Sequence, residues 1–179
     1  LYACENSGYE RFVVPVDRYG FVSADKLEKV LGRVRSVIAS CDSTLVTIMT
    51  ANNEIGTIEP VEKIGKIVKD YNKDIIFHVD AIQAYGKMRI YPKKMNIDLL
   101  SVSGHKIHGP KGTGFLFIKD KTKIKPLILG GGQQRAMRSG TENVPGIAGL
   151  GKAAELIYTK DFDEKVDKMY ELRDYFVSE

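Results

Sequence analysis

Short apolar runs alternate with amphipathic segments along most of the chain. Runs rich in branched residues occupy 44–49 (TLVTIM), 74–80 and 97–103, and between the first two lies 61–72, where apolar residues recur on one face of a helix. Strands that alternate with helices and are apolar on both faces are typical of a mostly parallel sheet of the α/β class. A fourth run, 114–120 (GFLFIKD), is expected to pair antiparallel with the third, because only a short loop separates the two.

Further elements are expected on either side of these runs. Residues 11–16 (RFVVPV) have the composition of a strand, and the next segment is expected to form a helix that Ser23 caps and Gly32 closes. Helical periodicity covers 144–158 and resumes after Phe162. Since the last apolar residues still follow this helical spacing and the chain does not begin with Met, we expect it to be a piece of a longer protein.

The composition excludes several classes of protein. A chain of 179 residues that is 43% hydrophobic is long enough for one domain with its own core. Its net charge of +4, from 27 basic and 23 acidic residues, is too balanced to indicate a nucleic-acid partner. Cys4 and Cys41 lack the spacing of a zinc or disulfide motif, so both are interpreted as ordinary thiols. No run resembles a leader or a membrane span, and we expect a cytoplasmic protein without membrane contact.

Three polar side chains follow the ends of three successive predicted strands. Asn53, Asp80 and Lys106 come at or just after the ends of the first, second and third strand. Ligands of such sheets bind beyond the carboxyl ends of the strands, and the glycines around the lysine let the backbone approach a ligand closely. The sequence therefore brings an amide, an acid and an amine to one edge of the sheet.

This combination matches the needs of pyridoxal phosphate. The cofactor requires a lysine that forms a Schiff base and an acid that keeps the pyridine nitrogen protonated, and Lys106 and Asp80 fit these two roles. Ser103 and His105 flank the lysine with a hydroxyl and an imidazole, which are donors that a phosphate ester prefers. Gln83, three residues after the acid, is the candidate donor to the phenolic oxygen.

Each of these residues also has an ordinary structural interpretation. Asp80 could cap a turn or a helix, and Lys106 could be solvated, as Lys111 is expected to be. His78 lies on the same strand face as Asp80, where a core histidine is at least as consistent with the sequence as a functional one. His108 could be a surface residue.

Other ligands fit the same residues less well. The glycine loop contains no G-x-x-x-x-G-K-[ST] sequence, and GTGFLF lacks the third glycine of the dinucleotide fingerprint. A metal site built from the histidines and Asp80 is not expected. His105 and His108 could face one metal only on a helix, which the neighbouring glycines and proline disfavour. A non-catalytic nucleotide or nucleic-acid binding module is the alternative from another class.

Four stretches of the chain read TANNEIGTIEPVEKIGKI, FHVDAIQAYGK, DLLSVSGHKIHGPKGTGFLFI and GGGQQRAMRSGTENVPGIAGLG. They resemble successive motifs of the cysteine desulfurases, which are aminotransferase class V enzymes. They occur in the same order as in that family, with the closest motifs between residues 45 and 150. The stretches SGHKIHGPKG and RSGTENV favour the branch that serves iron–sulfur assembly and tRNA thiolation.

The resemblance implies a role for each candidate residue. Lys106 is implied to be the Schiff-base lysine, and Thr141 to reach the phosphate bound by a partner subunit, which implies a homodimer. Arg138 belongs to the same motif as Thr141 but receives no role. The remaining implied contacts are Asp80 to the pyridinium, Gln83 to the phenolic oxygen, Ser103 and His105 to the phosphate, and Asn53 to the substrate carboxylate.

The resemblance also implies the fold and the domain content. Residues 1–179 correspond to the large cofactor-binding domain of the fold-type I, aspartate aminotransferase-like enzymes, a three-layer α/β domain that is here truncated at both ends. Residues 159–179 correspond to a helix leading towards a small domain that is absent. The family's phosphate loop and ring-stacking histidine fall before Leu1, and its persulfide-forming cysteine and carboxylate-binding arginine fall after Glu179. Neither cysteine of the chain lies in a matching motif.

The implied activity is the pyridoxal-phosphate-dependent removal of sulfur from L-cysteine. It gives L-alanine and an enzyme persulfide for iron–sulfur cluster, thio-cofactor or tRNA biosynthesis. The implied partners are L-cysteine, a second copy of the chain and sulfur-acceptor proteins. The chain alone is expected to bind the cofactor weakly and to transfer no sulfur. The nearer alternatives are another class V aminotransferase and a selenocysteine lyase.

Overall fold

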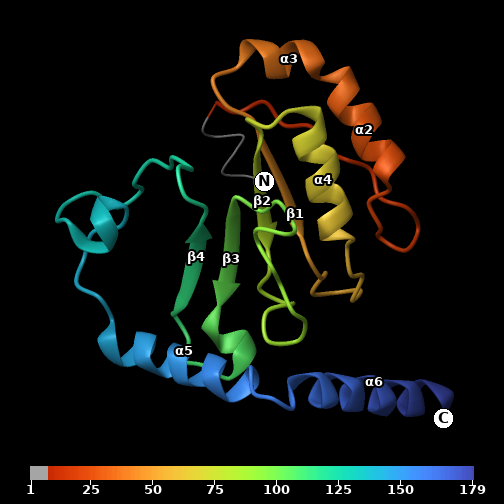
Figure 1. Ribbon diagram of the computed structural model, residues 1–179, viewed down its shortest axis with the longest axis vertical. Coiled ribbons are helices and arrows are strands. Elements are labelled where there is room, and N and C mark those ends of the chain that lie inside the picture. Colours follow the sequence, from red (N-terminus) through yellow and green to blue (C-terminus); the bar gives the residue numbers. More distant parts are fainter. Residues whose placement is uncertain (1–7) are drawn as a thin grey trace.

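The computed structural model describes residues 8–179 and contains one mixed sheet (Figure 1). The strands β1 (Leu45–Met49), β2 (Ile76–Asp80), β3 (Leu99–Ser103) and β4 (Gly114–Ile118) lie in that order across the sheet. The first three pair in parallel, and β4 is antiparallel to β3. The expected α/β fold, its mainly parallel sheet and its antiparallel fourth strand are confirmed. The helices are α2 (Ala24–Arg33), α3 (Arg35–Ser40), α4 (Val61–Tyr71), α5 (Val144–Ile157) and α6 (Phe162–Ser178), with the 3-10 helices η1 (Gly104–Ile107) and η2 (Gln133–Ala136).

The core lies between the sheet and the helices α2 and α4, which Figure 1 shows on one side of the sheet. Phe77 and Val79 of β2 are fully buried there, against Ile64 and Val68 of α4 and Leu27 of α2. The apolar residues of α4 recur every three or four positions, so that a single stripe of the helix faces the sheet. Burial of each such side chain stabilises the fold by about 1.5–3 kcal/mol.

The opposite face of the sheet is polar near its centre. Thr47, His78, Asp80, Ser101 and Ser103 occupy alternate strand positions and are half-buried or exposed. The expectation that every strand is apolar on both faces is therefore wrong for this face, because the two-residue alternation places polar side chains on it.

Helix α5 lies across the carboxyl edge of the sheet in Figure 1. Leu150 of α5 packs against Ile107 of η1, so the helix covers the turn that follows β3. Phe162, at the start of α6, stacks on Tyr158 with 5.0 Å between the ring centroids. The helices predicted for 144–158 and after Phe162 are confirmed. Within residues 8–179, no helix has both the length and the apolar character needed to cross a membrane.

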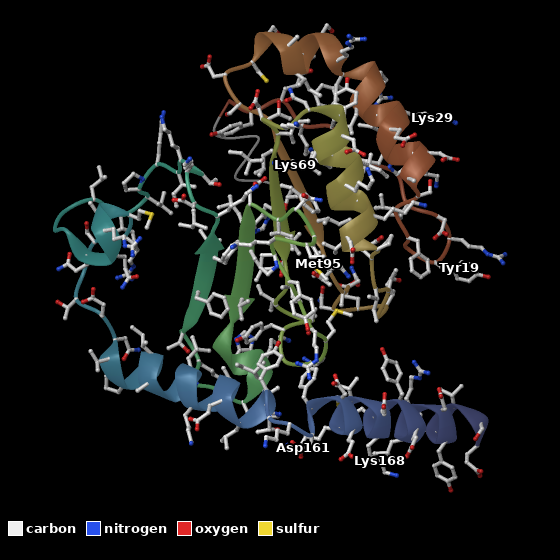
Figure 2. All side chains as sticks on the ribbon, viewed as in Figure 1. Tyr19, Lys29, Lys69, Met95, Asp161 and Lys168 are labelled. Atoms are coloured by element: carbon white, nitrogen blue, oxygen red, sulfur yellow. The ribbon has the colours of Figure 1, made fainter. Side chains whose placement is uncertain are left out.

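Asp98 anchors the amino end of β3 from inside the protein. Asp98 is only 5% exposed. Its Oδ2 accepts a hydrogen bond from the Phe77 N–H at 2.9 Å, and its Oδ1 accepts one from the Lys119 Nζ at 3.0 Å. It also forms an ion pair with Lys69 of α4, a residue labelled in Figure 2. Burial alone raises the pKa of this carboxyl, but the hydrogen bonds from Lys69, the Phe77 N–H and Lys119 lower the pKa below 3.8.

The segment 11–16, expected to be a strand, is not part of the sheet. Val16 forms a single antiparallel bridge with Val22, and Val13 is 63% exposed. Pro15 has no N–H to give to a strand ladder, and within the described residues the segment pairs with none of the four sheet strands. The prediction is wrong because branched apolar residues form a strand only where a partner strand is available.

The helix predicted to follow that segment is confirmed, but it ends differently. Ser23 caps α2, since its hydroxyl accepts a hydrogen bond from the Lys26 N–H at 3.3 Å. Gly32 does not close the helix, which continues to Arg33 and is joined to α3 through Val34. The backbone of Gly32 is not left-handed, as a closing glycine requires.

Candidate active site

The strands β1, β2 and β3 end at the same edge of the sheet because they run parallel. Asp80 is the last residue of β2, and its register neighbours are Met49 at the end of β1 and Ser101 in β3. Lys106 lies in η1, which follows β3 without a break. In Figure 1 this turn lies beside α5, at the edge where β3 ends. The structure therefore brings the segments that carry the predicted acid and the predicted amine to one edge.

Asp80 is half-buried and held by two backbone hydrogen bonds. Its Oδ1 accepts the Ile82 N–H at 2.9 Å, and its main-chain oxygen accepts the Thr50 N–H at 2.8 Å. The first bond is the turn cap that the sequence left open as an alternative, so the residue does cap the turn. Its Oδ2 accepts no hydrogen bond from the described part of the chain. A carboxylate held by one oxygen is fixed in direction and keeps the other oxygen for a ligand.

Lys106 is presented by a short, well-anchored helical turn. The Gly104 N–H donates to the Thr113 oxygen at 2.8 Å, and the Gly109 N–H donates back to the Gly104 oxygen at 2.9 Å. Ile107 is buried under the turn, whereas the Lys106 side chain is exposed. The sequence predicted no helix here. A single 3-10 turn forms nevertheless, because it ends before the Pro110 ring could interfere.

The two side chains that flank the lysine are hydrogen-bonded to each other. The Ser103 Oγ lies 3.1 Å from the Nδ1 of His105. His108 leaves the turn with a left-handed backbone (φ 63°) and is exposed, so it is separated from this pair. The structure thus joins Ser103 and His105 as the sequence predicted, and it leaves His108 at the surface.

The connection after β2 packs directly against the lysine turn. Gln83 is half-buried in a turn closed by the Ala84 N–H, which donates to the Ala81 oxygen at 3.0 Å. Gly86 then approaches η1 so closely that a Cβ on it would lie 2.7 Å from the Ile107 Cγ2. The Gly86 N–H donates to the hydroxyl of Tyr158 at 2.8 Å. Sequence reasoning missed Tyr158, because 72 residues separate it from its partner and no local pattern links them.

Lys87 is a second amine at this place. Burial lowers the pKa of Lys87, and the positive charge of Lys106 lowers the pKa further. The two ammonium groups therefore repel each other. A region that holds two such amines favours an anionic ligand.

Asn53 and Thr141 are exposed, and no side-chain hydrogen bond or ion pair joins either of them to the other predicted site residues. Asn53 lies in the turn after β1, which the side chain of Asn52 organises by accepting the N–H groups of Glu54 and Ile55 at 2.9 and 3.1 Å. Thr141 lies just before α5, close to the Asn143 cap of that helix. Their predicted contacts, to a substrate and to a partner's cofactor, stay predictions.

His78 is half-buried and hydrogen-bonded through both ring nitrogens. Its Nδ1 lies 2.6 Å from the Thr47 Oγ1, and its Nε2 lies 2.8 Å from the Ser101 Oγ. Burial lowers the pKa of His78 below 6.5, against the opposing pull of the Asp80 carboxylate. The sequence left this residue between a core and a functional interpretation, and the structure gives it polar partners on both sides.

The donor set suits a phosphorylated aromatic aldehyde such as pyridoxal phosphate. An exposed primary amine on a fixed turn suits the aldehyde, and the hydroxyl of Ser103 with the imidazole of His105 suits the phosphate. The free oxygen of Asp80 suits a protonated ring nitrogen. Among residues 8–179, no three His, Cys, Asp or Glu side chains form a group that could hold a metal ion.

Comparison with known proteins gives matches over nearly the whole chain. The model of the family described as aminotransferase class-V matches residues 2–179. The chain is 49% identical to the cysteine desulfurase IscS of Dictyoglomus turgidum over 98% of its own length. It is also 49% identical to the cysteine desulfurase IscS of Methanosarcina thermophila, over 99%.

Solved structures agree with these matches. A NifS-like protein superposes with a TM-score of 0.87 at 44% identity, covering 99% of this chain and 46% of that one. DndA from Streptomyces lividans superposes with a TM-score of 0.79 at 32% identity, covering 99% and 48%. The chain spans 42% of the length of each of the two curated relatives named above.

Proposed function

The chain belongs to the aminotransferase class-V family, and from that premise we propose that it is the cofactor-binding part of a cysteine desulfurase. The proposed reaction removes sulfur from L-cysteine and gives L-alanine and a persulfide on the enzyme. The identity of 49% to two cysteine desulfurases supports this activity over others in the family. Because the chain spans 42% of those relatives, the activity is proposed for a protein that carries this chain within a longer one.

The observation that carries the proposal is the surrounding of Lys106. Its amine is exposed on an anchored turn, the hydrogen-bonded pair of Ser103 and His105 lies beside it, and Asp80 has a free carboxylate oxygen at the adjacent strand end. We propose that Lys106 binds the aldehyde of pyridoxal phosphate covalently and that the Ser103 and His105 side chains hold the phosphate. Asp80 is the proposed partner of the ring nitrogen.

The proposed roles follow from the chemistry of these side chains. When bound, pyridoxal phosphate supplies a ring that accepts the negative charge developed at the α-carbon of the substrate. The Lys106 amine would also be the base that takes the α-proton of the substrate. Asp80 is half-buried, so its charge acts on a cationic partner more strongly than it would in water. Gln83 is the proposed donor to the phenolic oxygen, and Asn53 the proposed contact of the substrate carboxylate.

The proposal extends to the domain and its partners. Residues 1–179 are assigned to the large cofactor-binding domain, with α6 leading towards a second domain. The persulfide-forming cysteine and the carboxylate-binding arginine are assigned to parts of the protein outside this chain. Thr141 is the proposed contact of the phosphate in a second copy, which makes the protein a homodimer. Sulfur-acceptor proteins of iron–sulfur assembly or tRNA thiolation are the proposed partners, and the cytoplasm is the proposed location.

The test measures alanine and persulfide formed from L-cysteine by the longer protein that contains this chain. Lys106→Ala is expected to abolish both products, whereas Lys111→Ala, an exposed lysine of the same loop, is expected to retain most of the activity. Alanine production that survives Lys106→Ala would contradict the proposal. Reaction with selenocysteine but not cysteine would instead identify a selenocysteine lyase, and amino transfer to a keto acid would identify an aminotransferase.

A further inference from the structure

His78 bridges three strands on the polar face of the sheet. Its two ring nitrogens lie within hydrogen-bond distance of Thr47 in β1, at 2.6 Å, and of Ser101 in β3, at 2.8 Å. Thr47 is the register neighbour of His78, and Ser101 is the register neighbour of Asp80. The His78 side chain thus connects β1, β2 and β3. It lies on the same face of the sheet as Asp80, two residues before the end of β2.

We propose that His78 is a positioning residue: its ring ties the three parallel strands together behind Asp80 and so sets the place and the surroundings of that carboxylate. The inference rests on the proposed function, because it gives Asp80 a bound cofactor to act on. His78 itself lies two residues before Asp80, about 6.6 Å back along the strand at 3.3 Å per residue, and is not assigned any contact with the cofactor.

The geometry gives the ring a defined orientation. A neutral imidazole donates through one nitrogen and accepts through the other, and a hydroxyl can do either. Thr47 and Ser101 can therefore satisfy both nitrogens at once, which fixes the ring plane across the strands. Backbone hydrogen bonds join neighbouring parallel strands, and this side-chain link adds a restraint between their ends.

The charge of the ring matters as well as its position. β1 and β3 carry no ionisable side chain, and Asp80 is the charged group that acts on His78. A protonated His78 would partly neutralise the negative charge of Asp80. The Asp80 carboxylate would then attract a cationic cofactor ring less strongly. Because burial outweighs the attraction of Asp80 and lowers the pKa of His78, the ring is neutral at physiological pH.

Two variants test the two parts of the inference separately, the hydrogen-bonded link between the strands and the charge of the ring. His78→Gln keeps one donor and one acceptor near the same places but cannot become protonated, whereas His78→Phe keeps the shape of the ring and removes both polar atoms. We expect the affinity for pyridoxal phosphate to fall about tenfold in His78→Phe, because two hydroxyls on the sheet lose their partner. In His78→Gln the affinity for pyridoxal phosphate is expected to stay within about twofold of that of the unsubstituted protein, the parent, at pH 7.5.

The pH dependence of binding supplies a readout that a purely structural role would not move. As the pH falls through the lowered pKa of His78, the ring takes up a proton, and the parent is then expected to lose about threefold more cofactor affinity than His78→Gln. Changes in the cofactor phosphate and in Lys106 affect both proteins alike and cancel in the ratio. A ratio that does not change with pH, or equal affinities of the Phe variant and the parent, would overturn the inference.

A second measurement needs no cofactor. The chain contains three histidines, so 15N spectra of a histidine-labelled sample can be assigned by single substitution. The His78 signals are expected to show one fixed tautomer at neutral pH and to titrate below 6.5. Rapid tautomer exchange, or titration at or above 6.5, would contradict the proposed link. If these spectra are as expected but no cofactor attaches to Lys106, the proposed function fails while the strand link itself stands.

Discussion

One carboxylate oxygen of Asp80 accepts the Ile82 N–H, and the other accepts no hydrogen bond from residues 8–179. We predict that Asp80→Asn in the longer protein keeps the cofactor but lowers alanine production at least about 100-fold, because a neutral amide no longer stabilises a protonated ring nitrogen. The measurement is single-turnover alanine formation, with cofactor content read from absorbance. Asp120→Asn, an exposed carboxylate away from this edge, is the control. Near-normal turnover of Asp80→Asn would mean that Asp80 serves only as the turn cap.

Asp98 offers a test of stability at the same scale. Asp98→Asn is expected to lower the free energy of unfolding by about 3–5 kcal/mol, because it leaves the largely buried Lys69 without its partner. Urea unfolding at neutral pH measures the effect. The exposed pair of Lys66 and Asp70 on α4 is the matched control, and Asp70→Asn is expected to cost less than about 1 kcal/mol. Equal effects of the two substitutions would show that the Asp98 network adds no stability.

The same carboxyl predicts how stability changes in acid. The folded protein holds the pKa of Asp98 below 3.8, so its contribution is fully present above that value and is lost as the pH falls through the lower, folded pKa. The difference in unfolding free energy between the parent and Asp98→Asn should therefore shrink below about pH 4. A difference that stays constant down to the pH of acid unfolding would contradict the assigned hydrogen bonds.

At the level of elements, the β2 connection packs tightly against η1 near the site. Gly86 has φ +80°, and a Cβ there would lie 2.7 Å from the Ile107 Cγ2, whereas Gly112 has φ +75° with nothing within 4 Å. Gly112→Ala is expected to cost about 1 kcal/mol for its backbone angle, and Gly86→Ala about 1–3 kcal/mol more for the clash. Thermal or urea unfolding of both variants measures the difference. Equal losses would show that the β2 connection yields without disturbing η1.

The secondary-structure elements also show which parts of the fold the sequence pattern predicts. Four strands and the helices α4, α5 and α6 were predicted close to their observed bounds, because local periodicity specifies them. The strand at 11–16 was not correct, since strand formation depends on a neighbour that only the whole fold provides.

The candidate site was predictable only where its residues follow strand ends. Asp80 and Lys106 could be placed at one edge by the rule for parallel strands. The contacts of Gly86 with Tyr158, and of His78 with Thr47, join segments that are distant in sequence. Such contacts follow from tertiary packing, and no local sequence motif predicts them.

At the scale of the whole molecule, the thiol of Cys41 lies far from the proposed cofactor site. Cys41 is exposed and ends α3, which Figure 1 shows at the opposite end of the sheet from η1 and α5. The other cysteine, Cys4, lies outside the described residues. We therefore predict that residues 1–179 alone, loaded with pyridoxal phosphate and given L-cysteine, form no catalytic persulfide. Persulfide-specific labelling followed by peptide mass measurement tests this, and repeated turnover through Cys41 would contradict the assignment of the sulfur acceptor to another part of the protein.

The most direct measurement is the site at which pyridoxal phosphate attaches. Borohydride reduction of the cofactor-loaded protein, followed by digestion and peptide mass measurement, locates the reduced adduct on one lysine. We predict that it lies on Lys106, because this amine is exposed beside Ser103 and His105 and near the free oxygen of Asp80. An adduct on Lys87 or Lys111 instead, or a protein that binds no chromophore, would contradict the proposed cofactor site.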